Sequence, residues 1–140
     1  IGRNLDYAVG LEGSLKLKEI SYIHSEAYAA GELKHGTISL IERGTLVVAL
    51  ASCVPLFDKL VCNVVEVKSR GADVLGLTVA SKGEVFQKTV DHVITVPDTN
   101  PMLLPSLDVI PMQLFAYYVA LMRGCDIDKP RNLAKSVTVE

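Results

Sequence analysis

Residues 45–50, Thr-Leu-Val-Val-Ala-Leu, form a continuous apolar run of strand length. Segments with helical periodicity flank this run in sequence, so it predicts a strand that is buried on both faces of a parallel sheet. Two further runs, Val74 to Val79 and His92 to Val96, predict its neighbours. Because parallel strands need crossover connections, the alternation of strands and helices predicts an α/β fold, a doubly wound parallel sheet flanked by helices.

Helical patterns separate the three predicted strands. Pro55 suits a first helical position, and apolar residues at helical spacing continue to Arg70, where Gly71 marks the stop. The predicted helix at 107–123 contains Pro111, which either kinks that helix or marks its true start. The remaining predicted segments are a weak helix at 82–90, a loop at 98–105 broken by prolines, and the long apolar helix at 107–123.

The opening residues predict the end of one more strand. Ile1 is interpreted as its last residue, followed by a helix that is capped by Asn4 or Asp6 and runs to about His24. A turn and a short helix around residues 31–34 come next. The abrupt start at Ile1 predicts a piece of a longer protein, with the first strand largely missing and a sheet edge exposed.

Composition and charge narrow the classes of function. The 140 residues are 49% hydrophobic and 21% charged, which suits one domain with a substantial core. A net charge of −2 without a basic, aromatic-rich patch disfavours nucleic acid, and no apolar run reaches the about 18 residues of a membrane span. The cysteines lack CxxC spacing and predict reduced thiols in small core positions and a cytoplasmic protein. They are Cys53, Cys62 and Cys125.

Motif spacing gives no support for a cofactor. The His, Cys and Asp residues do not cluster with metal-ligand spacing, so no metal is expected. The sequence also lacks a GxGxxG motif and a P-loop, which gives a nucleotide site little support.

Charged residues gather in one stretch of the predicted first helix. Glu12, Lys16 and Glu19 fall at i, i+4 and i+7, which places two carboxylates and one ammonium on a single helical face. His35 follows in a short segment bounded by glycines. These groups could transfer protons. From spacing alone, a solvated salt-bridge ladder and a surface histidine stay open as the commoner interpretations of these residues.

Two long stretches resemble a known enzyme family. Residues 11–36, LEGSLKLKEISYIHSEAYAAGELKHG, are similar to the active-site signature of the second sugar-isomerase (SIS) domain of the glutamine–fructose-6-phosphate aminotransferases. Residues 130–140, PRNLAKSVTVE, are similar to the C-terminal tail of that family. The similarity covers essentially all 140 residues. It implies a flavodoxin-like SIS fold, with an N-terminally truncated second SIS domain at 1–125 and a catalytic tail at 126–140.

The resemblance implies a reaction and roles for its residues. Fructose 6-phosphate and glutamine would become glucosamine 6-phosphate and glutamate, the first step of hexosamine synthesis. Lys135 matches the lysine that forms an imine with the open-chain ketose, which requires a neutral amine. Glu19 matches the base that moves a proton between carbons 1 and 2. His35 matches a histidine of ring opening that is contributed across a subunit interface, which implies a homodimer.

The remaining matches concern binding and coupling between domains. Lys16 and Glu12 match residues with positioning or secondary proton-transfer roles at the hydroxyl end of the sugar. Ala134 and Arg131 lie in the tail, which is matched to substrate binding and to coupling with a glutaminase domain. No metal or organic cofactor is implied.

Two departures from the family pattern stand out. Thr37 occupies a position where many relatives have proline, and we expect only a local change of turn there. Compared with the family, the 140 residues also lack the glutaminase domain and the first SIS domain, whose Ser/Thr-rich loop holds the sugar phosphate. The 140 residues alone are therefore not expected to make glucosamine 6-phosphate.

Two other interpretations stay open. The first is a non-catalytic SIS module that binds a phosphosugar for regulation, although such a module would need neither Glu19 nor the tail with Lys135. The second is a flavodoxin-like binding domain for another ligand, which rests on fold analogy alone.

Overall fold

A three-stranded parallel sheet forms the centre of the computed structural model, which describes residues 1–131. The sheet order is β1-β2-β3, with Val47 opposite Val74 and Leu77 opposite Ile94. All three strand predictions are confirmed to within one residue. The strands are β1 (Leu46–Leu50), β2 (Asp73–Val79) and β3 (His92–Val96).

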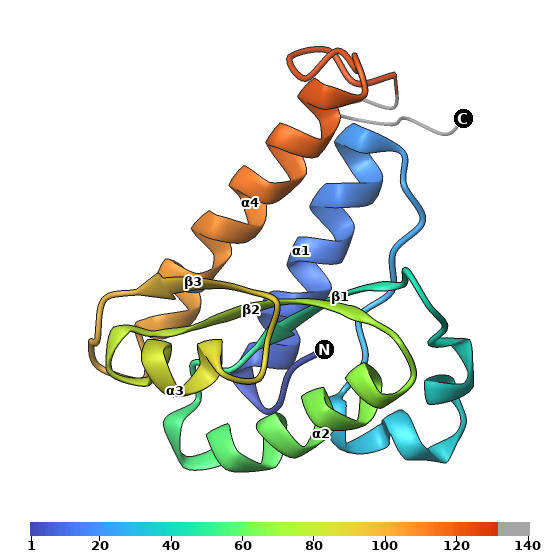
Figure 1. Cartoon of the computed structure of the whole chain (residues 1–140). Coiled ribbons are helices and arrows are strands. Elements are labelled where there is room, and N and C mark those ends of the chain that lie inside the picture. Colours follow the sequence, from blue (N-terminus) through green and yellow to red (C-terminus); the bar gives the residue numbers. More distant parts are fainter. Residues whose placement is uncertain (132–140) are drawn as a thin grey trace, which may run out of the picture.

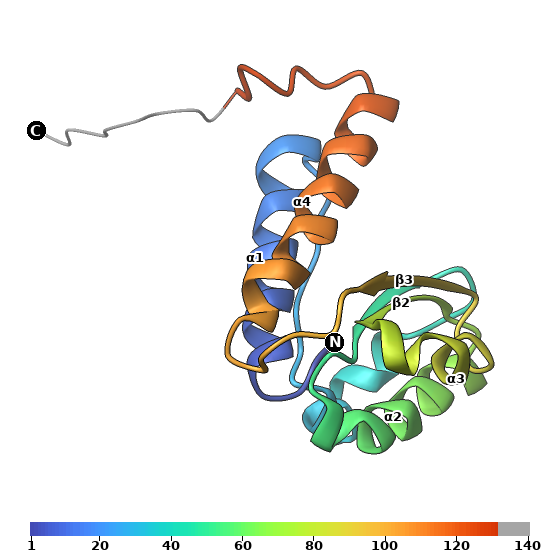
Figure 2. The ribbon, with the colours of Figure 1, turned by 90° about the vertical axis from the view of Figure 1, so that its left-hand side faces the viewer.

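Helices cover both faces of this sheet (Figure 1). The long helices α1 (Leu5–Ser21) and α4 (Leu104–Met122) lie side by side on one face, and α2 (Phe57–Ser69) and α3 (Gly83–Gln87) lie on the other (Figures 1 and 2). The predicted α/β fold with flanking helices is confirmed. Four 3₁₀ turns complete the described chain: η1 (Ala30–His35), η2 (Thr37–Leu40), η3 (Val54–Leu56) and η4 (Ala80–Lys82).

Each face of the sheet has its own apolar core. On the side of α2, Phe57 and Phe86 meet edge to face with ring centroids 5.4 Å apart. Gly76 on β2 makes room for this packing, because a Cβ there would lie 2.5 Å from the ring of Phe86. On the other side, Leu50 and Leu77 are fully buried beneath α1 and α4. Each fully buried side chain of this size contributes about 1.5–3 kcal/mol.

The first helix departs from its prediction at both ends. It ends at Ser21 rather than near His24, because Tyr22 adopts the left-handed conformation with φ 60°. Its start lacks the predicted cap, since Asn4 has φ 54° and its side chain bonds no helical N–H. Asp6 does not cap the helix either, because its carboxylate accepts the N–H of Cys53 at 3.0 Å.

The last helix begins earlier than predicted. It starts at Leu104, so Pro105 lies in the first turn, where the missing N–H of proline costs nothing, rather than in a loop. Pro111 lies inside the helix and does not mark its start. By length and composition α4 could cross a membrane, and it is the one such helix within residues 1–131. It packs along α1, however, and carries the buried Asp108. The carboxylate of Asp108 accepts a hydrogen bond from the hydroxyl of Ser52 at 2.9 Å.

The first two residues occupy the position of a strand beside β1. The amino group of Ile1 donates to the carbonyl of Val48 at 2.7 Å, and the N–H of Leu50 donates to the carbonyl of Ile1 at 2.9 Å. On its other side, Gly2 forms an isolated parallel bridge with Ala29. The chain therefore enters the domain between β1 and the segment that leads into η1, as expected for the end of a strand.

Candidate functional site

The predicted charged face lies on α1. The ammonium of Lys16 is 2.7 Å from a carboxylate oxygen of Glu19 and 3.5 Å from one of Glu12. The three side chains are between 32% and 47% exposed. The hydrogen bond that Lys16 donates to Glu19 raises the pKa of the Lys16 ammonium, which keeps it charged at neutral pH. The structure thus assembles both acids around one cation, a geometry that fits a salt-bridge ladder and a substrate site alike.

Glycines allow α1 to lie close to its neighbours. A Cβ at Gly13 would lie 3.2 Å from the side chain of Met112 on α4, and one at Gly10 would lie 3.4 Å from Leu50 on β1. The glycines therefore weaken α1 as an isolated helix but bring it into contact with both elements. This packing buries one side of α1 and leaves the charged face open to solvent.

His35 lies apart from that face. It ends η1, is 74% exposed, and its nearest acid is Glu32 at 3.8 Å. The turn itself is held by the buried Leu33 and by the ion pair of Lys34 with Glu66 at 2.7 Å. In both overall views, η1 lies across the sheet from the C-terminal end of α1 (Figures 1 and 2). Within one chain, the structure does not bring His35 to Glu12, Lys16 and Glu19.

The start of the tail lies against the end of α1. The backbone N–H of Arg131 donates to the hydroxyl oxygen of Tyr22 at 2.9 Å, and its guanidinium lies 3.9 Å from the centroid of the Tyr22 ring. Sequence reasoning missed Tyr22, because 109 residues separate the two partners and neither shows a spacing signal. The candidate residues Ala134 and Lys135 fall outside the described residues.

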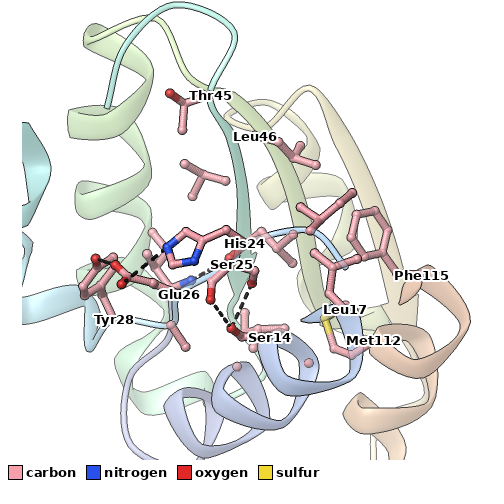
Figure 3. A pocket seen from close by; sticks show the side chains of 18 of the residues that line it. Ser14, Leu17, His24, Ser25, Glu26, Tyr28, Thr45, Leu46, Met112 and Phe115 are labelled. Atoms are coloured by element: carbon pink, nitrogen blue, oxygen red, sulfur yellow. Dashed lines mark hydrogen bonds and ion pairs between the residues drawn. The ribbon is translucent and has the colours of Figure 1, made fainter. Parts of the chain in front are cut away.

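A cavity of about 600 Å³ opens between α1, β1 and the segment 23–28 (Figure 3). Apolar side chains such as Leu17 and Phe115 form most of its wall. At one end, the hydroxyl of Ser14 donates to the carbonyl of Ser25, and the hydroxyl of Ser25 donates to Ser14. The cavity is lined by Ile1 and by β1, so it lies along the edge of that strand.

Thr37 also lines this cavity and departs from the family pattern. It begins η2 directly after Gly36, which has φ 150°. Its hydroxyl is buried and has no hydrogen-bond partner within the described part of the chain.

Two buried acids meet at the carboxyl end of β1. Asp6 and Asp108 are 5% and 1% exposed. Burial raises the pKa of Asp6 to about 7, and the neighbouring Asp108 adds to this rise, whereas the N–H of Cys53 opposes it. Burial also raises the pKa of Asp108 and of the Cys53 thiol. Sequence reasoning missed this pair, because each acid reads as an ordinary helix-start residue.

The cysteines and the remaining histidines are not assembled into a site. All three cysteines are free, as predicted, but Cys62 is exposed on α2, so its predicted core position is wrong. His24 lies 3.6 Å from Glu26 at the cavity wall. Among the residues that the structure describes, no group of three His, Cys, Asp or Glu side chains could hold a metal ion.

Residues 1–123 match the SIS domain model, so the chain belongs to the SIS domain family. Within this family it is homologous to the C-terminal SIS portion of the glutamine–fructose-6-phosphate aminotransferases, also called glucosamine-6-phosphate synthases. The isomerizing aminotransferase of Clostridium acetobutylicum is 61% identical over 140 residues, which are the whole of this chain and 23% of that relative.

Two solved structures are similar in fold to this chain. The C-terminal domain of glucosamine-fructose-6-phosphate aminotransferase from Francisella tularensis has a TM-score of 0.83 and 37% identity, over 91% of this chain and 36% of that one. A glucosamine-6-phosphate deaminase from Thermotoga maritima has a TM-score of 0.74 and 32% identity, over 95% and 37%. The chain thus spans about a quarter of the length of the aminotransferases that it matches.

Proposed function

We propose that this chain forms the imine and proton-transfer part of a glucosamine-6-phosphate synthase. The full-length protein would convert fructose 6-phosphate and glutamine to glucosamine 6-phosphate and glutamate, in the cytoplasm and in the synthesis of amino sugars. The observation that carries the proposal is the position of Arg131 on Tyr22. It brings the start of the tail to the end of α1 that bears Glu19.

The distances allow Lys135 to work with Glu19. Lys135 lies four residues beyond Arg131, and an extended chain of that length spans at most about 14 Å. Glu19 lies three residues before Tyr22, about 4.5 Å along the helix axis. The Lys135 amine can therefore reach a substrate that also touches the charged face of α1.

Each residue then has a chemical task. The Lys135 amine attacks carbon 2 of the open-chain ketose, and loss of water leaves an imine. Ammonia then adds to carbon 2 and displaces the Lys135 amine, and the resulting imine keeps the neighbouring C–H acidic. Glu19 takes the proton from carbon 1 and returns it to carbon 2 during isomerisation. Lys16, held between Glu12 and Glu19, positions the base and the sugar hydroxyls. Ala134 and Arg131 place the tail against the sugar and against the glutaminase domain.

Partners complete this site. The sugar phosphate would be held by the first SIS domain, and the ammonia would come from the glutaminase domain of the full-length chain. His35 would serve the site of the second subunit in a homodimer, which fits its exposed position away from Glu19. Exposed apolar side chains on α1 and α4 give such partners a surface: Leu11, Leu15, Ile110, Leu114, Tyr118 and Leu121.

Substitution of Lys135 in the full-length protein tests the proposal. Lys135→Ala is expected to abolish glucosamine 6-phosphate formation while glutamine hydrolysis persists, because only the imine is lost. Lys129→Ala, a second tail lysine, serves as the matched control and should retain synthesis. Loss of both activities together in Lys135→Ala, or continued synthesis, would contradict the imine role and would leave a phosphosugar-binding module as the better account.

A further inference from the structure

Tyr22 has a backbone conformation that tyrosine rarely adopts. It follows the last residue of α1 with φ 60° and ψ 22°, and its N–H donates to the carbonyl of Lys18 at 3.2 Å. Helices commonly end with a left-handed residue of this kind, but that residue is usually glycine, because a Cβ is strained there. Within residues 1–131, Asn4 is the one other non-glycine residue with a positive φ, and its ψ of −128° lies outside the left-handed helical region.

The side chain of Tyr22 has a partner that explains its presence. Its hydroxyl oxygen accepts the backbone N–H of Arg131, and its ring lies beneath the Arg131 guanidinium. One side chain thus holds both the backbone and the side chain of a single tail residue. Nearby, Gly124 follows the end of α4 and turns the chain with a φ of 68°, and the thiol of Cys125 approaches the carbonyl of Ser21 at 4.0 Å. The end of α4 therefore reaches the end of α1.

We propose that Tyr22 is a positioning residue that holds the C-terminal tail against the end of α1 through Arg131. This inference rests on the proposed function, since it assigns the tail a place beside Glu19. The strained backbone directs the Tyr22 ring to the tail, and glycine at the same position would end the helix without strain but would offer no contact. A stacked guanidinium and one hydrogen bond together correspond to roughly a tenfold change in the equilibrium constant for docking of the tail.

Tryptic cleavage after Arg131 measures docking directly in the 140-residue chain. Trypsin must bind the Arg131 guanidinium, one face of which lies against the Tyr22 ring in the docked state. Tyr22→Gly is expected to speed this cleavage about tenfold, while cleavage after Arg123, which Tyr22 does not contact, stays unchanged. Tyr22→Phe keeps the ring and loses the hydroxyl acceptor, so it should give an intermediate rate. Equal rates at Arg131 in all three chains would overturn the inference.

Synthesis by the full-length protein separates positioning from a structural role. Tyr22→Gly relieves backbone strain, so its melting temperature should be unchanged or higher, yet its kcat for glucosamine 6-phosphate should fall about tenfold with glutamine hydrolysis retained. Asn4→Gly is the matched control, because it also places glycine at a position with a positive φ and should keep full activity. Unchanged synthesis in Tyr22→Gly, or a fall that follows a lower melting temperature, would overturn the inference.

The two proposals can fail separately. If the unsubstituted full-length protein forms no glucosamine 6-phosphate, the proposed function fails, and the cleavage experiment still decides whether Tyr22 holds the tail. If it forms the product and Tyr22→Gly forms it equally fast, only the role of Tyr22 is wrong.

Discussion

Asp6 should make the stability of this domain depend on pH. Its carboxyl is 5% exposed at the start of α1, faces Asp108 of α4, and accepts the N–H of Cys53 from the loop after β1. Burial raises its pKa from 3.8 to about 7. Between these pH values the folded chain keeps a proton that the unfolded chain has lost, so stability falls as the pH rises from about 4 to about 7.

The magnitude follows from this difference in pKa. A change from 3.8 to about 7 corresponds to roughly 4 kcal/mol across the whole interval. Asp6→Asn keeps an oxygen that can accept the N–H of Cys53 and removes the ionisation. We expect Asp6→Asn to match the parent chain near pH 4 and to exceed its free energy of unfolding by up to about 4 kcal/mol at pH 8.

Urea unfolding at pH 4.5, 6 and 8, followed by circular dichroism, measures this difference. The buried amino group of Ile1 has a pKa lowered to about 6 by burial, so it stabilises the fold as the pH rises from about 6 to 8. It is present in both chains and cancels in the difference, whereas the coupling of Asp6 to Asp108 is lost in Asp6→Asn and forms part of that difference. Asp58→Asn, at an exposed site in the first turn of α2, is the matched control. A stability difference between Asp6→Asn and the parent that is independent of pH, or largest at low pH, would refute the reasoning.

Three further predictions concern packing and activity. Gly76→Ala should lower the free energy of unfolding by about 1–3 kcal/mol in urea titrations, because its Cβ would lie 2.5 Å from the Phe86 ring. A chain extended upstream of Ile1 by a strand of apolar residues should unfold at higher urea concentration, because the extension can pair with β1 and fill the cavity of about 600 Å³; an equal midpoint would count against a strand there. The 140 residues alone should form no glucosamine 6-phosphate from fructose 6-phosphate and glutamine, and measurable turnover would contradict the proposal that other domains supply the phosphate site and the ammonia.

Much of the fold could be predicted because local pattern and tertiary environment agree. The apolar runs at β1 and β2 are mostly buried as their composition indicates, and Gly71, with φ 94°, follows α2 as expected. The ends of the helices were harder to predict, because residues there depart from the usual preferences at helix boundaries. Tyr22 ends α1 in a conformation that favours glycine, and Pro105 fits within the first turn of α4.

The candidate site could be predicted only where its residues are close in sequence. Helical spacing placed Glu12, Lys16 and Glu19 together, and the ion pairs confirm that arrangement. Spacing could not predict the contact of Tyr22 with Arg131, since a turn at the end of α4 brings distant segments together. The buried acids and the cavity were missed for the same reason, because they form where separate elements meet.

The central claim is that Lys135 forms an imine with the sugar beside the charged face of α1. Incubating the full-length protein with fructose 6-phosphate and borohydride would reduce that imine to a stable amine, which peptide mass spectrometry can locate. The account predicts one hexose phosphate adduct on Lys135, absent in Lys135→Ala and present in Lys129→Ala. No adduct, or an adduct on another lysine such as Lys16, would contradict it.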